Sequence, residues 1–188
     1  MSSKKLKKIV IYGGSFNPPH IGHMIAIEAV LRNFPCDEIW VMPSSERRDK
    51  YIGVSGKHRI NMLRILIKEL FRKSKIQIKI SDLEIKRPKL TTTYDTLMEL
   101  KKLSASRRTS YKFYFLLGSE LLWDIRYKWV KGKELWKSCY FLAIVTQPHS
   151  QFSEFRSYIR LYDRHLINSG QMQPLPRMLP ALGSMRCF

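Results

Sequence analysis

The fold of this chain is decided by the stretch Gly13-Gly14-Ser15-Phe16-Asn17-Pro18-Pro19-His20-Ile21-Gly22-His23. The apolar, β-branched run just before it, residues 8–12, predicts a buried strand of a parallel sheet. The segment after it, residues 21–32, predicts a helix because its apolar residues recur at helical spacing. Glycines have no Cβ, so an anion can approach their N–H groups, and a helix N-terminus attracts negative charge. The stretch therefore predicts a site for a nucleotide phosphate.

Two histidines stand at the predicted helix start. His20 and His23 lie three residues apart, so both rings can face one point above the helix N-terminus. Imidazole can donate to phosphate oxygens while charge is redistributed during nucleotidyl transfer, which suits attack on an α-phosphate. Two other interpretations stay open, namely polar residues at a helix cap and a pair of metal ligands. A zinc site is disfavoured because no nearby cysteine or third histidine completes it.

The same stretch resembles the signature GGxFxPxHxGH of the HxGH nucleotidylyltransferases, and within them the bacterial nicotinate-mononucleotide adenylyltransferases. It is neither a GxGxxG fingerprint nor a Walker A loop, since no Gly-Lys-Ser/Thr follows. The resemblance implies a Rossmann-like domain that binds ATP through this turn and assigns Asn17 to the nicotinate nucleotide. The residues that it implies for ATP binding are Gly13, Gly14, Ser15, Phe16, His20, His23, Gly118 and Glu120.

A second strand, residues 38–43, is followed by a polar loop that contains Lys50. Basic residues beyond the end of a parallel strand lie where open α/β sheets bind ligands. The resemblance implies that Lys50 binds phosphates of both substrates and takes part in catalysis. Arg47-Arg48-Asp49 stands where the family has Pro-Pro-His, so the loop differs chemically. Ligand contact and a solvated surface role both stay open for Arg47 and Arg48.

A helix is predicted from Lys57 onward, followed by a strand over residues 76–80 that continues through residues 82–85. Arg59 and Met62 match the family's R-x-x-M element, and the resemblance implies that Arg59 binds the nicotinate nucleotide. The apolar positions expected to pack this helix on the sheet are Ile60, Leu63, Ile65, Leu66 and Leu70.

The segment Thr91-Thr92-Thr93-Tyr94-Asp95-Thr96-Leu97 precedes another predicted helix and resembles the family's S-Y-T-x-D-T-L. Ordinary helix capping explains these residue types by itself. The resemblance implies that Thr93 and Asp95 face the nicotinate-bearing nucleotide. Binding is favoured for Thr93, and both interpretations stay open for Asp95.

Two further strands are predicted at residues 111–117 and 140–145. The first ends at Gly118-Ser119-Glu120, where the family has Gly-x-Asp near the adenosine, so Glu120 is a longer acid at that position. Trp129 aligns with a family tryptophan that stacks on the pyridine ring, which an indole face suits. Packing in the core stays open for Trp129. The family's arginine after the last strand is absent here.

These elements predict an α/β fold, a Rossmann-like doubly wound parallel sheet with helices on both faces. The domain is expected over residues 1–165. Of all residues 44% are hydrophobic, which suffices for a core, and no apolar run approaches the ~20 residues that cross a bilayer. The three cysteines have no metal or disulfide spacing, which favours reduced thiols and a cytoplasmic protein.

The formal net charge of +19 raises an alternative of another class, a nucleic-acid-binding protein without turnover. The basic residues are scattered along the chain and form no recognised binding motif, so no specific nucleic acid is expected as a partner. Steering of polyanionic substrates is compatible with this charge. No membrane partner is expected, and assembly into a homo-oligomer is left open.

The C-terminal segment, residues 166–188, departs from the family. Relatives close the site with a second phosphate motif, I-S-S-T-x-I/V-R, whereas residues 165–188 contain no Lys, Asp or Glu and include three prolines that disfavour a helix. Residues 156–160 imitate the end of that motif but come too soon after Gly118. Residues 165–172 can be encoded by CAC CTC ATC AAC TCA GGT CAG ATG, which one base later reads Thr-Ser-Ser-Thr-Gln-Val-Arg. We therefore hypothesise a frameshift near Leu166 that impairs activity.

Together these features predict adenylyl transfer from ATP to nicotinate or nicotinamide mononucleotide, with release of pyrophosphate, in NAD biosynthesis. Mg²⁺ bound through the ATP phosphates is expected as a cofactor. The alternative is a sister enzyme with the same first motif that acts on phosphopantetheine, or that uses CTP on a phosphorylated polyol.

Overall fold

The computed structural model describes residues 6–45, 52–87, 92–105, 109–148 and 155–162. Within these ranges the strands are β1 (Leu6–Gly14), β2 (Glu38–Pro43), β3 (Gln77–Ile80), β4 (Ser110–Gly118), β5 (Tyr140–Pro148) and β6 (Phe155–Tyr162). The helices there are α1 (Ile21–Asn33), α2 (Gly56–Phe71), α3 (Thr93–Ala105), α4 (Leu121–Tyr127) and α5 (Gly132–Ser138). None of these helices is long and apolar enough to cross a membrane.

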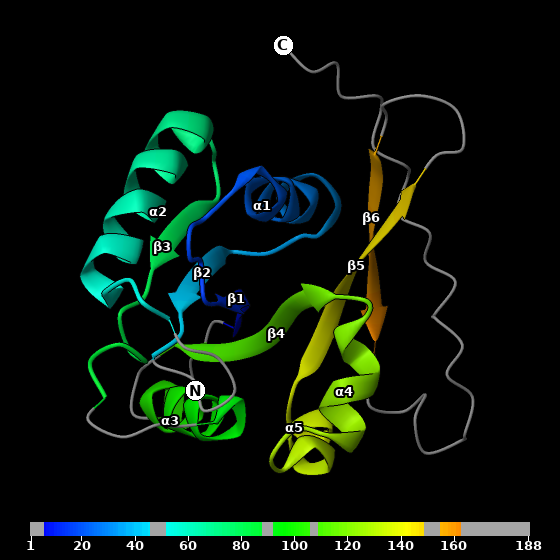
Figure 1. Cartoon of the computed structure of the whole chain (residues 1–188). Coiled ribbons are helices and arrows are strands. Elements are labelled where there is room, and N and C mark those ends of the chain that lie inside the picture. Colours follow the sequence, from blue (N-terminus) through cyan, green and yellow to red (C-terminus); the bar gives the residue numbers. More distant parts are fainter. Residues whose placement is uncertain (1–5, 46–51, 88–91, 106–108, 149–154, 163–188) are drawn as a thin grey trace.

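The strands form one sheet in the order β3-β2-β1-β4-β5-β6, and β1 to β5 pair in parallel (Figure 1). This confirms the predicted parallel sheet. The edge strand β6 was not predicted. It pairs antiparallel with β5 in a register that runs from Phe141 opposite Tyr162 to Pro148 opposite Phe155. Only six residues separate the two strands in the sequence, whereas a parallel return needs a crossover of about a dozen residues or more.

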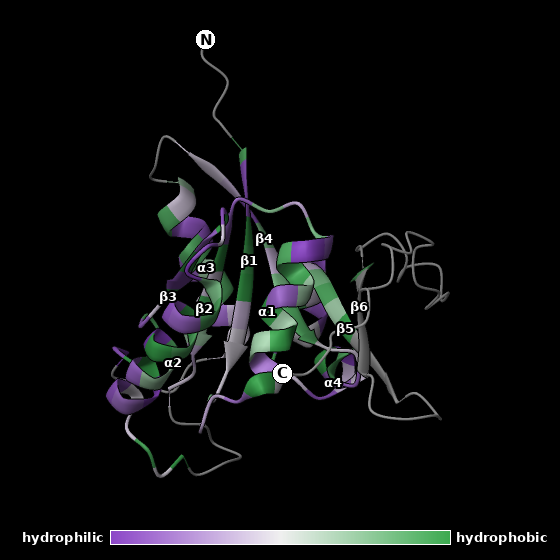
Figure 2. Cartoon of the chain, turned by 90° about the horizontal axis from the view of Figure 1, so that it is seen from above, coloured by the Kyte–Doolittle hydropathy of each residue, from purple (hydrophilic) through white to green (hydrophobic). Residues whose placement is uncertain are grey.

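Alternate residues of the strands point to opposite faces of the sheet and build two cores. Helices α1 and α2 cover one face, and α3, α4 and α5 cover the other (Figure 1). In Figure 2 the middle of the central strand β1 is coloured as hydrophobic. The core on the α1 and α2 face includes Val10, Met24, Ile27, Val30, Ile39, Val41, Leu63, Leu116 and Leu142. The other core includes Ile9, Ile11, Leu97, Leu100, Phe113, Phe115, Ile125, Leu135, Trp136 and Phe141. The doubly wound architecture is therefore confirmed.

The structure corrects the expected packing of α2. Ile65 is 68% exposed and Leu70 is 51% exposed, so neither packs on the sheet. Ile65 follows the buried Leu63 by two residues, which turns it about 200° around the helix. Ile67 and Phe71 pack against the core in the last turns instead.

The structure also corrects the predicted extension of β3 through residues 82–85. The strand ends at Ile80, and residues 83–86 form a turn in which the N–H of Lys86 donates to the carbonyl of Asp82 at 3.0 Å. The pairing stops because β2, its only neighbour in the sheet, ends at Pro43. The N–H of Ser81 makes the last bond to β2, donating to Val41 at 2.8 Å.

Candidate active site at the switch point of the sheet

The candidate site lies at the carboxyl ends of β1 and β4, which are neighbours in the sheet. The chain leaves β1 toward α1 on one face and leaves β4 toward α4 on the other (Figure 1). Such a topological switch point opens a crevice in which α/β sheets bind ligands. Gly13 and Gly14 end β1, and Gly118 ends β4, so the structure brings both predicted glycine turns to this edge.

Phe16 anchors the turn that follows β1. Its side chain is fully buried although its φ of 48° is in the left-handed region that few non-glycine residues adopt. The ring packs edge-on against Tyr12 at 5.4 Å between centroids and against His23 at 4.8 Å. A Cβ on Gly14 would lie 3.2 Å from the Phe16 ring, so a glycine there makes room for this packing. The aromatic side chain of the turn thus points into the core.

His20 and His23 form the start of α1. His20 is the exposed N-cap residue, and its backbone N–H donates to Nδ1 of His23 at 3.1 Å. The two ring centroids are 3.8 Å apart. A Cβ on Gly22 would lie 3.1 Å from the His20 ring, so the glycine between them lets that ring fold back over the first turn. The same two histidines therefore cap the N-terminus of α1 and hold their rings against each other.

The half-buried His23 ring is neutral at ordinary pH. Burial and, next, the neighbouring His20 lower the pKa of His23 to about 4. Because Nδ1 accepts a hydrogen bond, the proton of the neutral ring sits on Nε2. His23 therefore offers one N–H donor at a helix N-terminus, where a phosphate is favoured.

Glu120, the N-cap residue of α4, stands two residues after the end of β4. Its carboxylate lies against Gly118, where a Cβ would come within 2.0 Å of Oε1. Burial and, next, the charge of Glu120 raise the pKa of Tyr12 to about 12, which places this acid near β1. Glu120 is solvent-exposed and therefore accessible to a polar ligand.

Thr93 and Asp95 stand at the start of α3. The carboxylate of Asp95 accepts hydrogen bonds from the N–H and the hydroxyl of Thr92, at 2.9 and 2.8 Å. The hydroxyl of Thr92 accepts from the N–H of Asp95 at 3.2 Å. This reciprocal cap accounts for Asp95 without a ligand. Thr93 is partly buried in the first turn.

Trp129 lies in the turn between α4 and α5. It is partly buried and packs against the core below α3, so one part of the indole remains accessible. The ammonium of Lys131, whose φ is 53°, lies 4.9 Å from the centre of the Tyr94 ring. This contact joins the Trp129 turn to the start of α3. The structure therefore brings together the two segments that the resemblance assigns to the pyridine ring.

Arg59 lies on the first turn of α2 but is 2% exposed. Its guanidinium donates to the backbone carbonyls of Ser15, Ser44 and Val54. Asn17 is partly buried in the turn after β1. Lys50, Arg47 and Arg48 lie outside the described residues.

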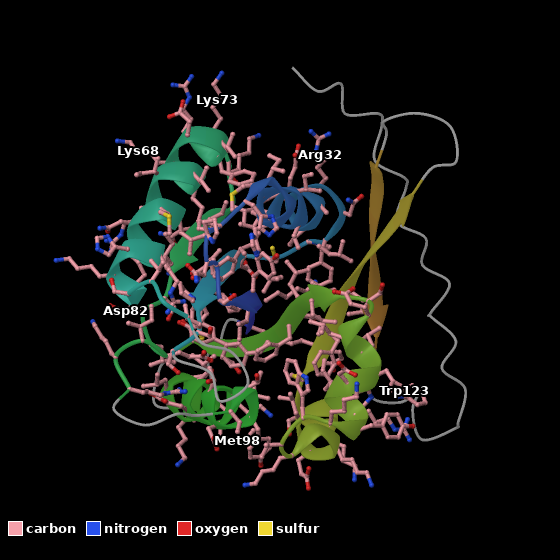
Figure 3. All side chains as sticks on the ribbon, in the orientation of Figure 1. Arg32, Lys68, Lys73, Asp82, Met98 and Trp123 are labelled. Carbon is pink, nitrogen blue, oxygen red and sulfur yellow. The ribbon has the colours of Figure 1, made fainter. Side chains whose placement is uncertain are left out.

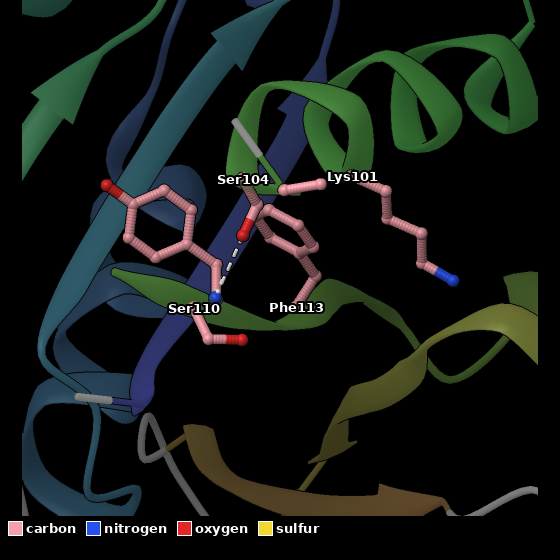
Figure 4. A pocket seen from close by; sticks show the side chains of 6 residues that line it. Lys101, Ser104, Ser110 and Phe113 are labelled. Atoms are coloured by element: carbon pink, nitrogen blue, oxygen red, sulfur yellow. Dashed lines mark hydrogen bonds between the residues drawn. The ribbon is translucent and has the colours of Figure 1, made fainter. Parts of the chain in front are cut away.

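A pocket of about 240 Å³ lies at the opposite end of the sheet (Figure 4). It is lined by the end of α3, including Lys101 and Ser104, and by the start of β4, including Ser110 and Phe113. The N–H of Tyr111 donates to the Ser104 hydroxyl at 3.0 Å. Because this pocket is at the amino end of β4, it is separate from the glycine turns.

In the described part of the chain, exposed cationic side chains lie on several different elements. Arg32 on α1, Lys68 on α2 and Lys73 just after α2 point into solvent (Figure 3). Of the three cysteines, Cys36 and Cys139 are free, and burial raises the pKa of their thiols to about 11 and 12. Cys187 lies outside the described residues.

The glycine turn at the switch point of the sheet and the paired histidines define a nucleotidyltransferase type of site. Residues 11–173 match the family model described as cytidylyltransferase-like, and the chain belongs to this family. Among curated proteins it is similar to the probable nicotinate-nucleotide adenylyltransferase of Oceanobacillus iheyensis, with 34% identity over 77% of this chain and 71% of the relative. It is also similar to the nicotinate-nucleotide adenylyltransferase of Bacillus subtilis, with 31% identity over 74% and 69%.

The chain is also similar to solved structures of an adenylyltransferase. The Plasmodium falciparum nicotinic acid mononucleotide adenylyltransferase complexed with NaAD superposes with a TM-score of 0.65 and 35% identity, over 78% of this chain and 68% of that one. The same enzyme complexed with APC gives a TM-score of 0.63 and 32% identity, over 78% and 67%. The predicted fold and the predicted family are therefore confirmed.

Proposed function

We propose that this chain transfers the adenylyl group of ATP to nicotinate or nicotinamide mononucleotide in NAD biosynthesis. The observation that carries this function is the pairing of His20 and His23 at the N-terminus of α1, next to the glycine end of β1. The names of the curated relatives and the NaAD complex of the solved structure support the choice of a pyridine mononucleotide.

In this reaction the 5′-phosphate of the mononucleotide attacks the α-phosphate of ATP and pyrophosphate leaves. The attacking phosphate is already a nucleophile, so no general base is needed. The protein contributes positioning and charge stabilisation. Nε2–H of His23, the His20 ring and the backbone N–H groups of Gly14, Ser15 and Phe16 bind the phosphates, and Lys50 adds a positive charge.

The remaining contacts divide between the two nucleotides. Gly118 and Glu120 lie beside the adenosine, where the exposed carboxylate accepts from ribose or base donors. Thr93 and Trp129 face the pyridine ring, and Asn17 lies beside the nicotinate nucleotide. Asp95 contributes mainly by capping α3, as its hydrogen bonds to Thr92 indicate.

Mg²⁺ enters with the triphosphate. Among the described residues, no group of three His, Cys, Asp or Glu side chains is arranged to hold a metal ion. A Mg²⁺ ion that enters with ATP is held mainly by phosphate oxygens and water. When bound, the ion neutralises charge on the phosphates. We place the reaction in the cytoplasm, where these substrates are used.

The decisive experiment compares substrates in parallel. Purified protein is incubated with ATP and, separately, with nicotinate mononucleotide, nicotinamide mononucleotide or phosphopantetheine, and with CTP and a phosphorylated polyol, while pyrophosphate release is measured. We expect turnover with a pyridine mononucleotide. Turnover with ATP and phosphopantetheine, or with CTP and the polyol, but with neither pyridine mononucleotide, would establish the sister enzyme instead. Salt-sensitive retention of RNA or DNA without any turnover would favour the nucleic-acid-binding alternative.

We also propose a boundary near residue 165, with residues 166–188 as a frameshifted tail. These residues lie outside the described ranges. The frameshift is tested by reading the gene, because Ser-Ser-Thr-x-Val-Arg must appear one base later. A variant with the repaired reading frame should be about 100–1,000-fold faster than the 188-residue chain, since it regains a phosphate-binding helix end. Equal rates would refute the impairment.

A further inference from the structure

Arg59 is a buried cation whose guanidinium donates hydrogen bonds to three backbone carbonyls from three separate segments. Nη1 donates to Ser15 O at 2.6 Å, Nη2 to Ser44 O at 2.8 Å and Nε to Val54 O at 3.2 Å. With 2% of its surface exposed, Arg59 is among the few charged residues that are buried in the described part of the chain. A buried charge is stable only where it is hydrogen-bonded, and here every nitrogen of the guanidinium has such a partner.

The three carbonyls lie at functionally distinct places. Ser15 belongs to the turn between β1 and α1 that carries the phosphate donors. Ser44 directly follows β2, and its own N–H donates to Gly14 O at 2.8 Å. Val54 directly precedes Ser55, the N-cap of α2. In the sequence, Ser44 and Val54 stand on either side of Lys50, and Arg59 links both of them to the phosphate turn.

We propose that Arg59 is a positioning residue that holds the phosphate turn at Ser15 against Ser44 and Val54 and does not touch the mononucleotide. This inference rests on the proposed function and replaces the ligand contact that the family resemblance implied for Arg59. A guanidinium can hold three segments together because its planar group donates hydrogen bonds in several directions at once. The ammonium of a lysine is a single point charge and cannot reach the three carbonyls together.

The first test separates kcat from KM. Arg59→Lys and Arg59→Met are compared with Arg64→Met, an exposed arginine of the same helix that bonds only to Asn61 within the described residues. We expect kcat to fall about 10-fold in Arg59→Lys and at least 30-fold in Arg59→Met, as losses of transition-state positioning. KM for nicotinate mononucleotide should stay within threefold, and Arg64→Met should match the wild type. A tenfold rise in that KM with unchanged kcat would overturn the proposal.

The second test does not depend on turnover. Hydrogen–deuterium exchange is measured on the wild type, Arg59→Lys and Arg64→Met. We expect faster exchange in both segments, residues 13–17 and 44–54, in Arg59→Lys only. Unchanged exchange in either segment would refute the coupling, even if Arg59→Met fails to fold. If the wild type turns over no pyridine mononucleotide, the proposed function fails, while this exchange pattern still decides the role of Arg59.

Discussion

The backbone N–H of His20 donates to Nδ1 of His23 at 3.1 Å, and the two rings are tilted by 41° with their centroids 3.8 Å apart. This bond fixes the tautomer of His23, because a ring that accepts at Nδ1 and is neutral must carry its proton on Nε2. The cap of α1 therefore leaves His23 with one N–H donor, on Nε2, in the first turn of the helix. A single local interaction begins the helix and orients a candidate catalytic group.

Replacing either histidine should slow the reaction without removing the fold. We expect His20→Asn and His23→Asn to lower kcat about 100–1,000-fold, the effect that loss of one donor to a developing charge usually has. Steady-state pyrophosphate release measures this effect. His58→Asn, at an exposed position on α2, is the matched control and should retain wild-type kcat. Retained activity in both site variants would remove the histidines from catalysis.

The half-buried His23 should make the protein less stable in acid. Its pKa is about 4 in the fold against an ordinary value of 6.5, so the unfolded chain binds the extra proton between these values. The free energy of unfolding is therefore unaffected by His23 above pH 6.5. It falls as the pH is lowered from 6.5 toward 4, with a slope of at most about 1.4 kcal/mol per pH unit from this group. Urea unfolding at pH 7 and pH 5 measures the loss. His23→Asn should show a shallower slope, and an identical slope would contradict the assignment.

Adding one methyl group at Gly22 should displace His20. The Cβ of alanine would lie 3.1 Å from Cε1 and Nδ1 of the His20 ring, so the ring must move away from the first turn. We expect Gly22→Ala to lower kcat about 10-fold while the melting temperature stays equal or rises, since alanine favours helices. Kinetics and thermal unfolding of the same preparation check both parts. A fall in both quantities would show damage to the fold instead.

Replacing Trp129 should weaken the binding of one substrate only, the pyridine mononucleotide. We expect Trp129→Ala to raise KM for the pyridine mononucleotide about 10-fold, because stacking of a flat ring on an indole contributes about 1–3 kcal/mol. KM for ATP should stay within twofold. Trp123→Ala is the control, since Trp123 is 56% exposed on α4 and points away from the core (Figure 3). Equal effects of the two variants would place Trp129 in a structural role.

Sequence patterns predicted the elements that depend on near neighbours. The bounds of β2 were predicted without error, and α1 was predicted to within one residue. Patterns failed where packing decided the outcome, as for Ile65 and for the turn at residues 83–86. Capping was one of the two interpretations that the sequence left open for Asp95, and the structure shows it in the hydrogen bonds between Asp95 and Thr92. The burial of Arg59 had no local signal, since a helix start rich in polar residues looks the same when it is exposed.

The sequence by itself determined the strand, the glycine turn and the helix with its two histidines, because these depend on glycine conformations, β-branching and helical period within about twenty residues. The tertiary structure alone decided which distant groups meet there. Arg59 reaches Ser15 across 44 positions of the chain, and Glu120 comes near Tyr12 because β4 pairs with β1. Such contacts depend on the order of strands in the sheet, a property of the whole fold and not of any one segment.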